Sequence, residues 1–265
     1  MILQDHLPYD IGTPRPLTGV APLDPSDWLI VDEAFGAQMA ERDALLNTRR
    51  PAVLAERPEA DAAAAELRDE VLAHLPPGFV RQSDRVQRPD GVWVTLDADT
   101  PLATLGRLVQ EDLCLIQKPD GAAEHVLTAA VLCFPSRWSL AEKLGQPLTR
   151  IHGPVNVYND DVARRVQRLF DGLQPGRPLW RWNATPTHQP ALFRPMTEAE
   201  AHADATPTLG DAEFLRSERQ VLWRLPRTRA VVFSIHTYVL RTADVTRGPR
   251  AHENAITRSA PSPTR

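Results

Sequence analysis

The sequence predicts an α+β fold in which an antiparallel sheet carries helices on one side and follows a helical N-terminal lobe. Apolar residues recur at helical spacing through the first third of the chain. From residue 91 onward, several segments alternate apolar and polar residues with period two, which is typical of half-buried strands. Short helices and one longer helix stand between the early strands and the last three. This order favours α+β architecture.

The first third is predicted to be an extended arm followed by helices. Residues 1–27 are rich in proline and aspartate, and we expect them to lie as an arm on a surface. In "DPSDW", Asp24 or Ser26 can cap the free N–H groups of a helix start. Helical spacing then continues through residues 31–50 and 60–76.

The remaining segments are predicted to supply the sheet and the helices that cover it. Strands are predicted at 91–97, 108–121, 124–135 and 177–188, with a hairpin at 213–242 that turns at "LPRTR". A short helix is expected at 139–145, and an amphipathic helix at 160–176. This order resembles that of PAS domains, whose helical segment and sheet form a half-open cup for a planar ligand.

We therefore divide the chain into three parts. Residues 1–86 form the arm and helical lobe, and residues 87–245 form the PAS-like domain. Residues 246–265 have little apolar content, and we expect a disordered tail.

Composition excludes several functional classes. The 265 residues carry a net charge of −4, which gives no drive toward nucleic acid or a membrane surface. No apolar run approaches the roughly 18 residues that span a bilayer, so we expect a cytoplasmic protein. Cys114 and Cys133 stand in apolar runs and predict buried thiols; two cysteines are too few for an iron–sulfur cluster. C-x-x-C-H is missing, which excludes covalently attached haem.

The stretch "CFPSRWSLAEKLGQPLTRIHGPV" holds three candidate site residues and a fourth, weaker one, Lys143. His152 stands in a stiff Gly-Pro bend and can be a structural residue or a metal ligand. Arg137 is either a surface residue or the partner of an anionic group such as a propionate. Trp138 is either a core residue or an aromatic wall. Lys143 can act like Arg137, although a solvated helix charge is the simpler interpretation.

The hairpin places further candidates by alternation. Glu218 shares one face of its strand with Gln220, and it either points into the cup or pairs with an arginine. His236 and Tyr238 share one face of the next strand. They are expected to be pocket residues or solvent-facing ones.

Several stretches together resemble the haem-dependent oxidative N-demethylase family. They are "CFPSRWSLAEKLGQPLTRIHGPV", "RWNATPTHQPALF", "FLRSERQVLWRLPRTRAVVFSIHTYV" and "PLDPSDWLIVDEAFGAQMAERDALL", and the similarity covers roughly residues 7–242. The resemblance implies non-covalent haem b in a PAS-like domain. It also implies oxidation of the methyl group of a small secondary amine such as dimethylamine by O2. The implied partners are a flavin/iron–sulfur reductase, which delivers electrons, and a folate-linked subunit.

The resemblance also implies site residues. His152 matches the axial ligand of the haem iron, and Glu218 the residue that faces substrate or oxygen. Tyr238 is the second catalytic candidate, while Arg137 and Trp138 fall in matching motifs at the cofactor. His236 stands where the family usually has arginine, so a propionate contact or proton path differs there. A haem-binding PAS sensor and a non-catalytic haem subunit are the alternative functions.

Overall fold

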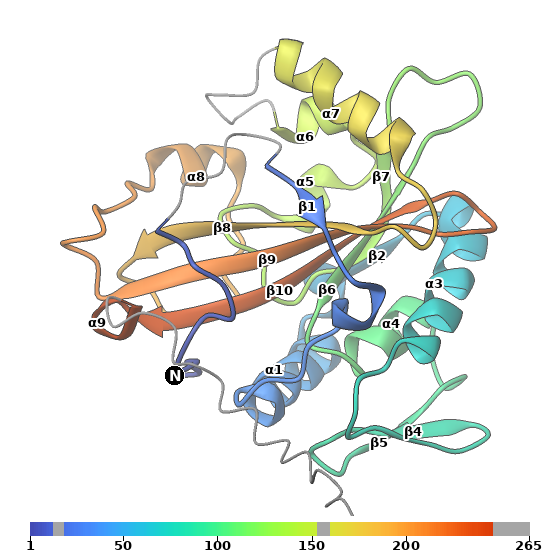
Figure 1. Ribbon diagram of the computed structural model, residues 1–265, viewed down its shortest axis with the longest axis horizontal. Helices are drawn as coiled ribbons and strands as arrows, with labels where there is room; N and C mark the ends of the chain where they lie inside the picture. The colour runs from blue at the N-terminus through green and yellow to red at the C-terminus, as the bar shows by residue number, and fades with distance from the viewer. Residues whose placement is uncertain (13–18, 153–159, 246–265) are drawn as a thin grey trace, which may run out of the picture.

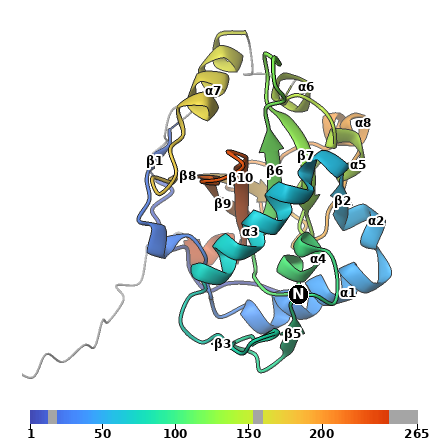
Figure 2. The same ribbon diagram turned by 90° about the vertical axis from the view of Figure 1, so that its right-hand side faces the viewer.

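A computed structural model describes residues 1–12, 19–152 and 160–245. Its centre is a seven-stranded antiparallel sheet with helices on both faces (Figures 1 and 2). In spatial order the strands are β1 (Ala21–Pro22), β8 (Leu179–Thr187), β9 (Phe214–Arg224), β10 (Val231–Arg241), β6 (Asp112–Gln117), β7 (Val126–Val131) and β2 (Leu54–Glu56). The α+β class and the antiparallel sheet are therefore as predicted.

The longest ladder joins β9 and β10 over eleven residue pairs. The turn lies at 226–228, inside the predicted "LPRTR" stretch. Strand β8 pairs along the other edge of β9 over nine residues, so the three C-terminal strands form the middle of the sheet. Because paired residues of antiparallel strands share a face, this register divides all three strands into two sets of side chains.

One face of the sheet is covered by the N-terminal helices. These are α1 (Phe35–Thr48), α2 (Arg50–Val53), α3 (Asp61–Ala73) and α4 (Pro101–Gly106). Leu46, Leu67 and Leu105 pack with Leu113 and Val232 in the largest apolar cluster. A short 3₁₀ helix, Pro25–Asp27, is capped by the Asp24 side chain, as the sequence predicts.

The opposite face is covered by α5 (Leu140–Lys143), α6 (Leu148–His152) and α7 (Asp160–Gly172) (Figures 1 and 2). Leu140, Leu148 and Phe170 pack there against Leu222 and Ile235. The expectation of helices on one side is corrected, because the N-terminal helices cover the other face. A sheet with apolar residues on both faces has to be covered on both.

Three shorter elements complete the chain. A separate three-stranded sheet consists of β3 (Val80–Arg81), β4 (Arg85–Gln87) and β5 (Trp93–Thr95). Helix α8 (Glu198–Ala203) lies near the end of β8, and α9 (Thr242–Val245) follows β10. The predicted strand at 91–97 thus pairs outside the main sheet, and the predicted tail lies outside the described residues.

The N-terminal arm lies deeper than the sequence suggests. Gln4 is buried and exchanges hydrogen bonds with β10: its side chain accepts from Val239 N at 2.9 Å and donates to Thr237 O at 3.2 Å. Its amide also donates to Asp32 at 3.1 Å. The arm therefore lies along the surface, as predicted, but Gln4 and Leu7 anchor it in the interior.

Beneath the arm, His236 lies between two carboxylates. Its Nε2 is 3.1 Å from Asp32 Oδ2, and its Nδ1 is 3.0 Å from Glu111 Oε1. Burial alone would lower the pKa of His236, but the hydrogen bonds to Asp32 and Glu111 outweigh it and raise the pKa to about 9. A fully buried imidazolium thus joins β10 to the segment at residue 32 and to Glu111, directly before β6.

This arrangement predicts an alkaline loss of stability. Below pH 6.5 the imidazole is protonated in both the folded and the unfolded chain, so its contribution to stability is fully present. Between pH 6.5 and about 9 only the folded chain holds the proton, and this contribution is lost progressively as the pH rises. We expect the free energy of unfolding in urea to fall by about 3 kcal/mol across this range.

His236→Gln should remove that fall, with lower stability at pH 7. His125→Gln is the matched control, since burial lowers the pKa of His125 and the alkaline fall should persist. A wild-type stability that stays flat from pH 6.5 to 9 would contradict the charged state assigned to His236.

Candidate functional site

The sheet face beneath α5, α6 and α7 carries a polar cluster centred on Glu218. On β9, Glu218 pairs with Asn183 of β8 and Thr237 of β10, so all three side chains share this face. The Glu218 side chain is 13% exposed. The sequence-based alternation is therefore correct: Glu218 belongs to the face on which a cup would open.

Three neighbours orient the Glu218 carboxylate. Asn183 Nδ2 donates to its Oε2 at 3.0 Å, and Gln220 Nε2 donates to the same oxygen at 3.1 Å. Arg216 Nε lies 3.5 Å from Oε1. One carboxylate oxygen is thus committed to two amides, while the other faces a guanidinium at the edge of hydrogen-bonding distance. Of the two sequence interpretations of Glu218, the arginine partner is observed, and the position in a cup stays a prediction.

Arg181 adds a second cation to this face. It pairs with Gln220 across the β8–β9 ladder and is half-buried. Burial lowers the pKa of the Arg181 guanidinium, and Glu218 opposes this shift. Arg181 is not among the candidate residues that the sequence predicted.

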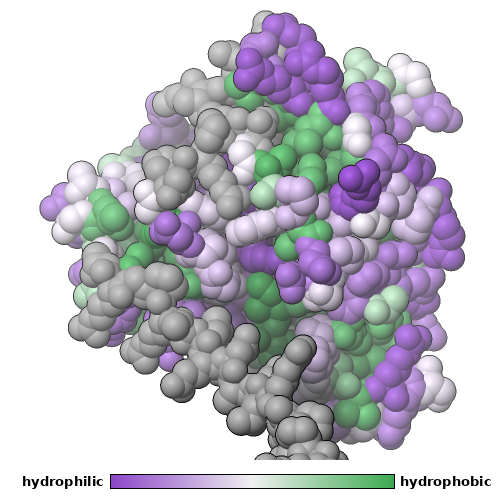
Figure 3. All heavy atoms as spheres, viewed as in Figure 1, coloured by the Kyte–Doolittle hydropathy of each residue, from purple (hydrophilic) through white to green (hydrophobic). Residues whose placement is uncertain are grey.

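A layer of partly buried apolar side chains lies between the sheet and the helices. Its members pack against the cluster that includes Leu140 and Leu222, and they are Val20, Ala55, Trp138, Ile151, Val166, Leu169, Leu179 and Phe233. Figure 3 shows hydrophobic atoms at the surface directly below the strongly hydrophilic outer side of α7. Apolar side chains left half-covered are what a flat hydrophobic cofactor needs, so these residues fit a haem.

His152 is the last residue of α6, on the same side of the sheet as Glu218. Its side chain lies outside the described part of the structure, so its role as ligand stays a prediction. Among the described residues, no group of three or more His, Cys, Asp or Glu is placed to hold a metal ion.

The end of α6 is held by a network that local sequence patterns did not reveal. Lys143 Nζ donates to Ile151 O at 3.0 Å and to Glu198 Oε1 at 2.7 Å. Arg150 also binds Glu198, through Nη1 at 2.7 Å and Nη2 at 3.1 Å. These hydrogen bonds, with Arg150 first and Lys143 second, lower the pKa of Glu198 to about 2. A single carboxylate of α8 therefore fixes the residues just before His152.

The network corrects the simpler interpretation of Lys143. It is 4% exposed rather than a solvated helix charge. Glu198 is 55 residues away along the chain, so no local pattern connects the two. Burial of an ammonium requires such a partner.

Arg137 binds the loop after α8. Its guanidinium donates to Asp204 Oδ2 at 3.1 Å, Thr206 Oγ1 at 2.9 Å, and the carbonyls of Ala201 and Asp204 at 2.6 Å each. Its φ of 63° lies in the left-handed region, which costs a residue with a side chain about 1 kcal/mol or more. The backbone strain is offset by these four hydrogen bonds. A contact with a cofactor carboxylate stays a prediction for Arg137.

His236 and Tyr238 lie on the sheet face opposite Glu218. The register pairs Tyr238 with Ser217 and His236 with Arg219, which alternate with Glu218 along β9. Both side chains are buried, against the expectation of pocket or solvent-facing positions. The reason is that the N-terminal segments cover this face: Tyr9 stands edge-on to the Tyr238 ring at 5.9 Å. The structure does not bring His236 and Tyr238 together with Glu218.

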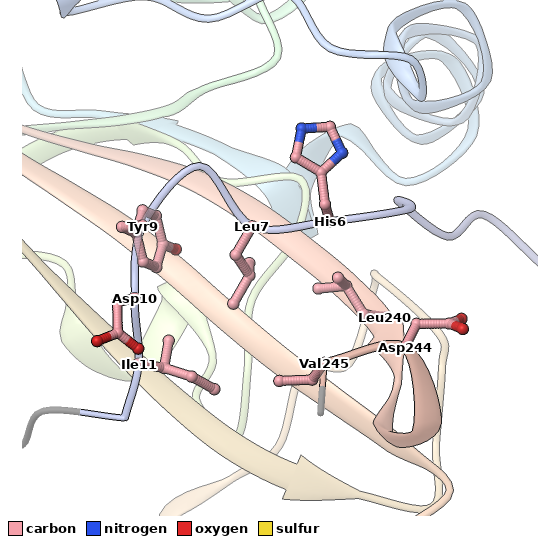
Figure 4. Close-up of a pocket in the computed structure, with 8 residues that line it drawn as sticks. All are labelled: His6, Leu7, Tyr9, Asp10, Ile11, Leu240, Asp244 and Val245. Atoms are coloured by element: carbon pink, nitrogen blue, oxygen red, sulfur yellow. The ribbon is translucent and has the colours of Figure 1, made fainter. Parts of the chain in front are cut away.

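A small pocket of about 60 Å³ lies beside the same arm (Figure 4). Figure 4 shows Leu7, Ile11, Leu240 and Val245 around it, with the His6 ring pointing away. Leu7 and Leu240 belong to the apolar cluster of Tyr238. The pocket is a packing defect beneath the arm and has no connection to Glu218 in the described contacts.

The Glu198 network predicts that α6 is loosened by a change in α8. Glu198→Gln removes the charged acceptor of Lys143 and Arg150, and we expect amide hydrogen exchange at residues 148–152 to rise by roughly an order of magnitude.

Glu200→Gln is the control, because Glu200 caps its own helix through Thr197 and does not contact α6. Equal exchange at 148–152 in both variants would show that Glu198 does not hold the end of α6.

Comparison with known families identifies the family of the chain. No helix in the described ranges is both long and apolar enough to cross a membrane. A family model described as haem-dependent oxidative N-demethylase, alpha subunit-like, matches residues 19–261, which is most of the chain. The match confirms the resemblance drawn from the sequence. This chain belongs to the haem-dependent oxidative N-demethylase alpha subunit-like family.

Proposed function

We propose that this chain uses non-covalently bound haem b to oxidise the N-methyl group of a small secondary amine such as dimethylamine. The observation that carries the proposal is Glu218: a carboxylate oriented by Asn183 and Gln220 on the sheet face that also bears half-covered apolar side chains. Such a carboxylate suits a cationic amine placed beside a hydrophobic cofactor.

The face shared by Glu218 and α5–α7 acts in this proposal as the PAS-like cup for haem. Trp138, Ile151 and Leu169 would supply apolar contacts to the macrocycle. His152, at the end of α6, would bind the haem iron, and Glu198 and Lys143 would hold that helix end in place. When bound, the haem supplies O2 binding and oxidation chemistry that no side chain offers.

Glu218 would bind the substrate ammonium and fix which methyl group faces the cofactor. Its Oε2 is already committed to the two amides, whereas Oε1 has only Arg216 Nε at 3.5 Å beside it, so Oε1 is the oxygen that would accept from the amine. The apolar layer would exclude bulk water from the reacting methyl group.

The reaction needs electrons from outside this chain. Amine, O2, two electrons and two protons give the demethylated amine, formaldehyde and water, which balances atoms and charge. The family description as an alpha subunit supports partner subunits. We propose that a flavin/iron–sulfur reductase supplies the electrons and that a folate-binding partner receives the formaldehyde carbon.

The cofactor is tested by absorbance spectroscopy of the purified chain. We expect a Soret band that shifts on reduction with dithionite, with one haem per chain. His152→Ala should abolish stoichiometric haem, whereas His202→Ala, which changes an exposed histidine of α8, should retain it. Unchanged haem content and spectrum in His152→Ala would refute the ligand assignment.

Turnover is tested by formaldehyde release with dimethylamine, O2 and a reductase. Glu218→Gln removes the negative charge while keeping nearly the same shape, and we expect kcat/KM to fall by about tenfold or more with haem content unchanged. Glu213→Gln, an exposed position on the same segment, should match the wild type. A chain that binds haem but releases no formaldehyde would instead support a sensor or a non-catalytic subunit.

A further inference from the structure

A pocket with charged walls lies between the end of β8 and the loop after α8, on the side of Arg216 and Thr185. Its volume is about 160 Å³, close to that of a cavity that holds a benzene ring. Thr185 and Arg216 line it from the same sheet face as Glu218. The pocket is therefore large enough for a small organic group and lies on the substrate side of the sheet.

The charge balance of the pocket favours an anion. Three guanidinium groups line it, those of Arg137, Arg194 and Arg216, against one carboxylate, that of Asp204. Asp204 Oδ2 already accepts from Arg137 at 3.1 Å and from Arg194 at 3.0 Å. Because two arginines share one carboxylate, the pocket lining retains a net positive charge.

Some N–H donors of these arginines are also not used in described hydrogen bonds. An arginine has five N–H donors. The side chain of Arg194 makes two described hydrogen bonds, one with Asp204 and one, at 3.4 Å, with Thr187 Oγ1. Arg216 is 5% exposed, and its buried Nε has Glu218 Oε1, at 3.5 Å, as its described neighbour but makes no hydrogen bond of ordinary geometry. A buried N–H without an acceptor is costly, and a ligand oxygen nearby would relieve that cost.

Arg216 also connects the pocket to the amine site. Its Nη1 donates to Leu192 O at 3.1 Å and its Nη2 to Phe134 O at 2.5 Å, which fixes the guanidinium in the pocket wall. Its Nε lies 3.5 Å from Glu218 Oε1. One rigid side chain thus stands between a surplus of positive charge and the carboxylate proposed to hold the ammonium.

We propose that the arginine pocket binds the carboxylate of a small N-methylated amino acid whose ammonium group is held by Glu218. This inference rests on the proposed function and narrows its substrate class from secondary amines in general to those that also carry a carboxylate. Arg194 provides the free donors, and Arg216 sets the spacing between the two charged ends.

The test is isothermal titration calorimetry of the haem-loaded chain with N-methylglycine, dimethylamine and acetate at low salt. N-methylglycine should bind about tenfold or more tightly than dimethylamine, and acetate should compete with it. Arg194→Gln should weaken N-methylglycine by roughly 10- to 100-fold and leave dimethylamine unchanged. Arg194→Lys, which retains the charge, should recover part of the loss and guards against a folding defect.

Arg168→Gln is the matched control, because Arg168 is exposed on α7. Equal affinity of N-methylglycine and dimethylamine, or an Arg194→Gln variant that binds both like the wild type, overturns the pocket assignment. The haem spectrum and dimethylamine-driven formaldehyde release would then still stand. Arginine-dependent binding of N-methylglycine without a Soret band would instead support the pocket and refute the haem function.

Discussion

The β9–β10 ladder is the constraint on which the rest of the molecule depends. Its eleven pairs fix the register of the hairpin, and a slip of one residue would move every side chain to the other face. Glu218 then points toward α5–α7, whereas His236 points toward the N-terminal helices. The functional division of the protein into two sides follows from this single register.

Each side contains buried charges, and each charge has a specific partner. On the N-terminal side, Arg42 is fully buried and contacts Asp112 at 2.7 Å, while Asp112 accepts the backbone N–H groups of Cys133 and Phe134. On the other side, Lys143 is buried against Glu198. Charges buried in this way require satisfied hydrogen bonds, so they restrict how the helices can sit on the sheet. The N-terminal ion pair maintains the scaffold, and the Lys143 pair maintains the region of the candidate site.

Local sequence patterns predicted the strands well because alternation depends only on neighbouring residues. They placed Glu218 and Gln220 on one face and His236 and Tyr238 together on one face, as the structure shows. These patterns could not predict which helices or segments would cover each face of the sheet. His236 is buried because Asp32, 204 residues away, reaches it.

The same limit explains the site residues that the sequence did not reveal. Asn183 acts on Glu218 from 35 residues away, and Arg137 contacts a loop 64 to 69 residues away. Nothing in the local spacing links these positions, since their approach depends on sheet pairing and loop closure. Cys114 and Cys133 could be predicted as buried and free, because apolar runs alone indicate burial. The division of the chain at residue 86 stays a prediction.

Helix α8 contacts both regions of the candidate site. The first residue of α8, Glu198, binds α6 just before His152. Asp204, directly after the end of α8, lies in the wall of the arginine pocket. These two carboxylates therefore stand at opposite ends of one short helix. A ligand that draws Asp204 away from Arg137 and Arg194 would also displace Glu198, at the other end of α8. Occupancy of the pocket would then be coupled through α8 to the end of α6, where the residue proposed to bind haem stands.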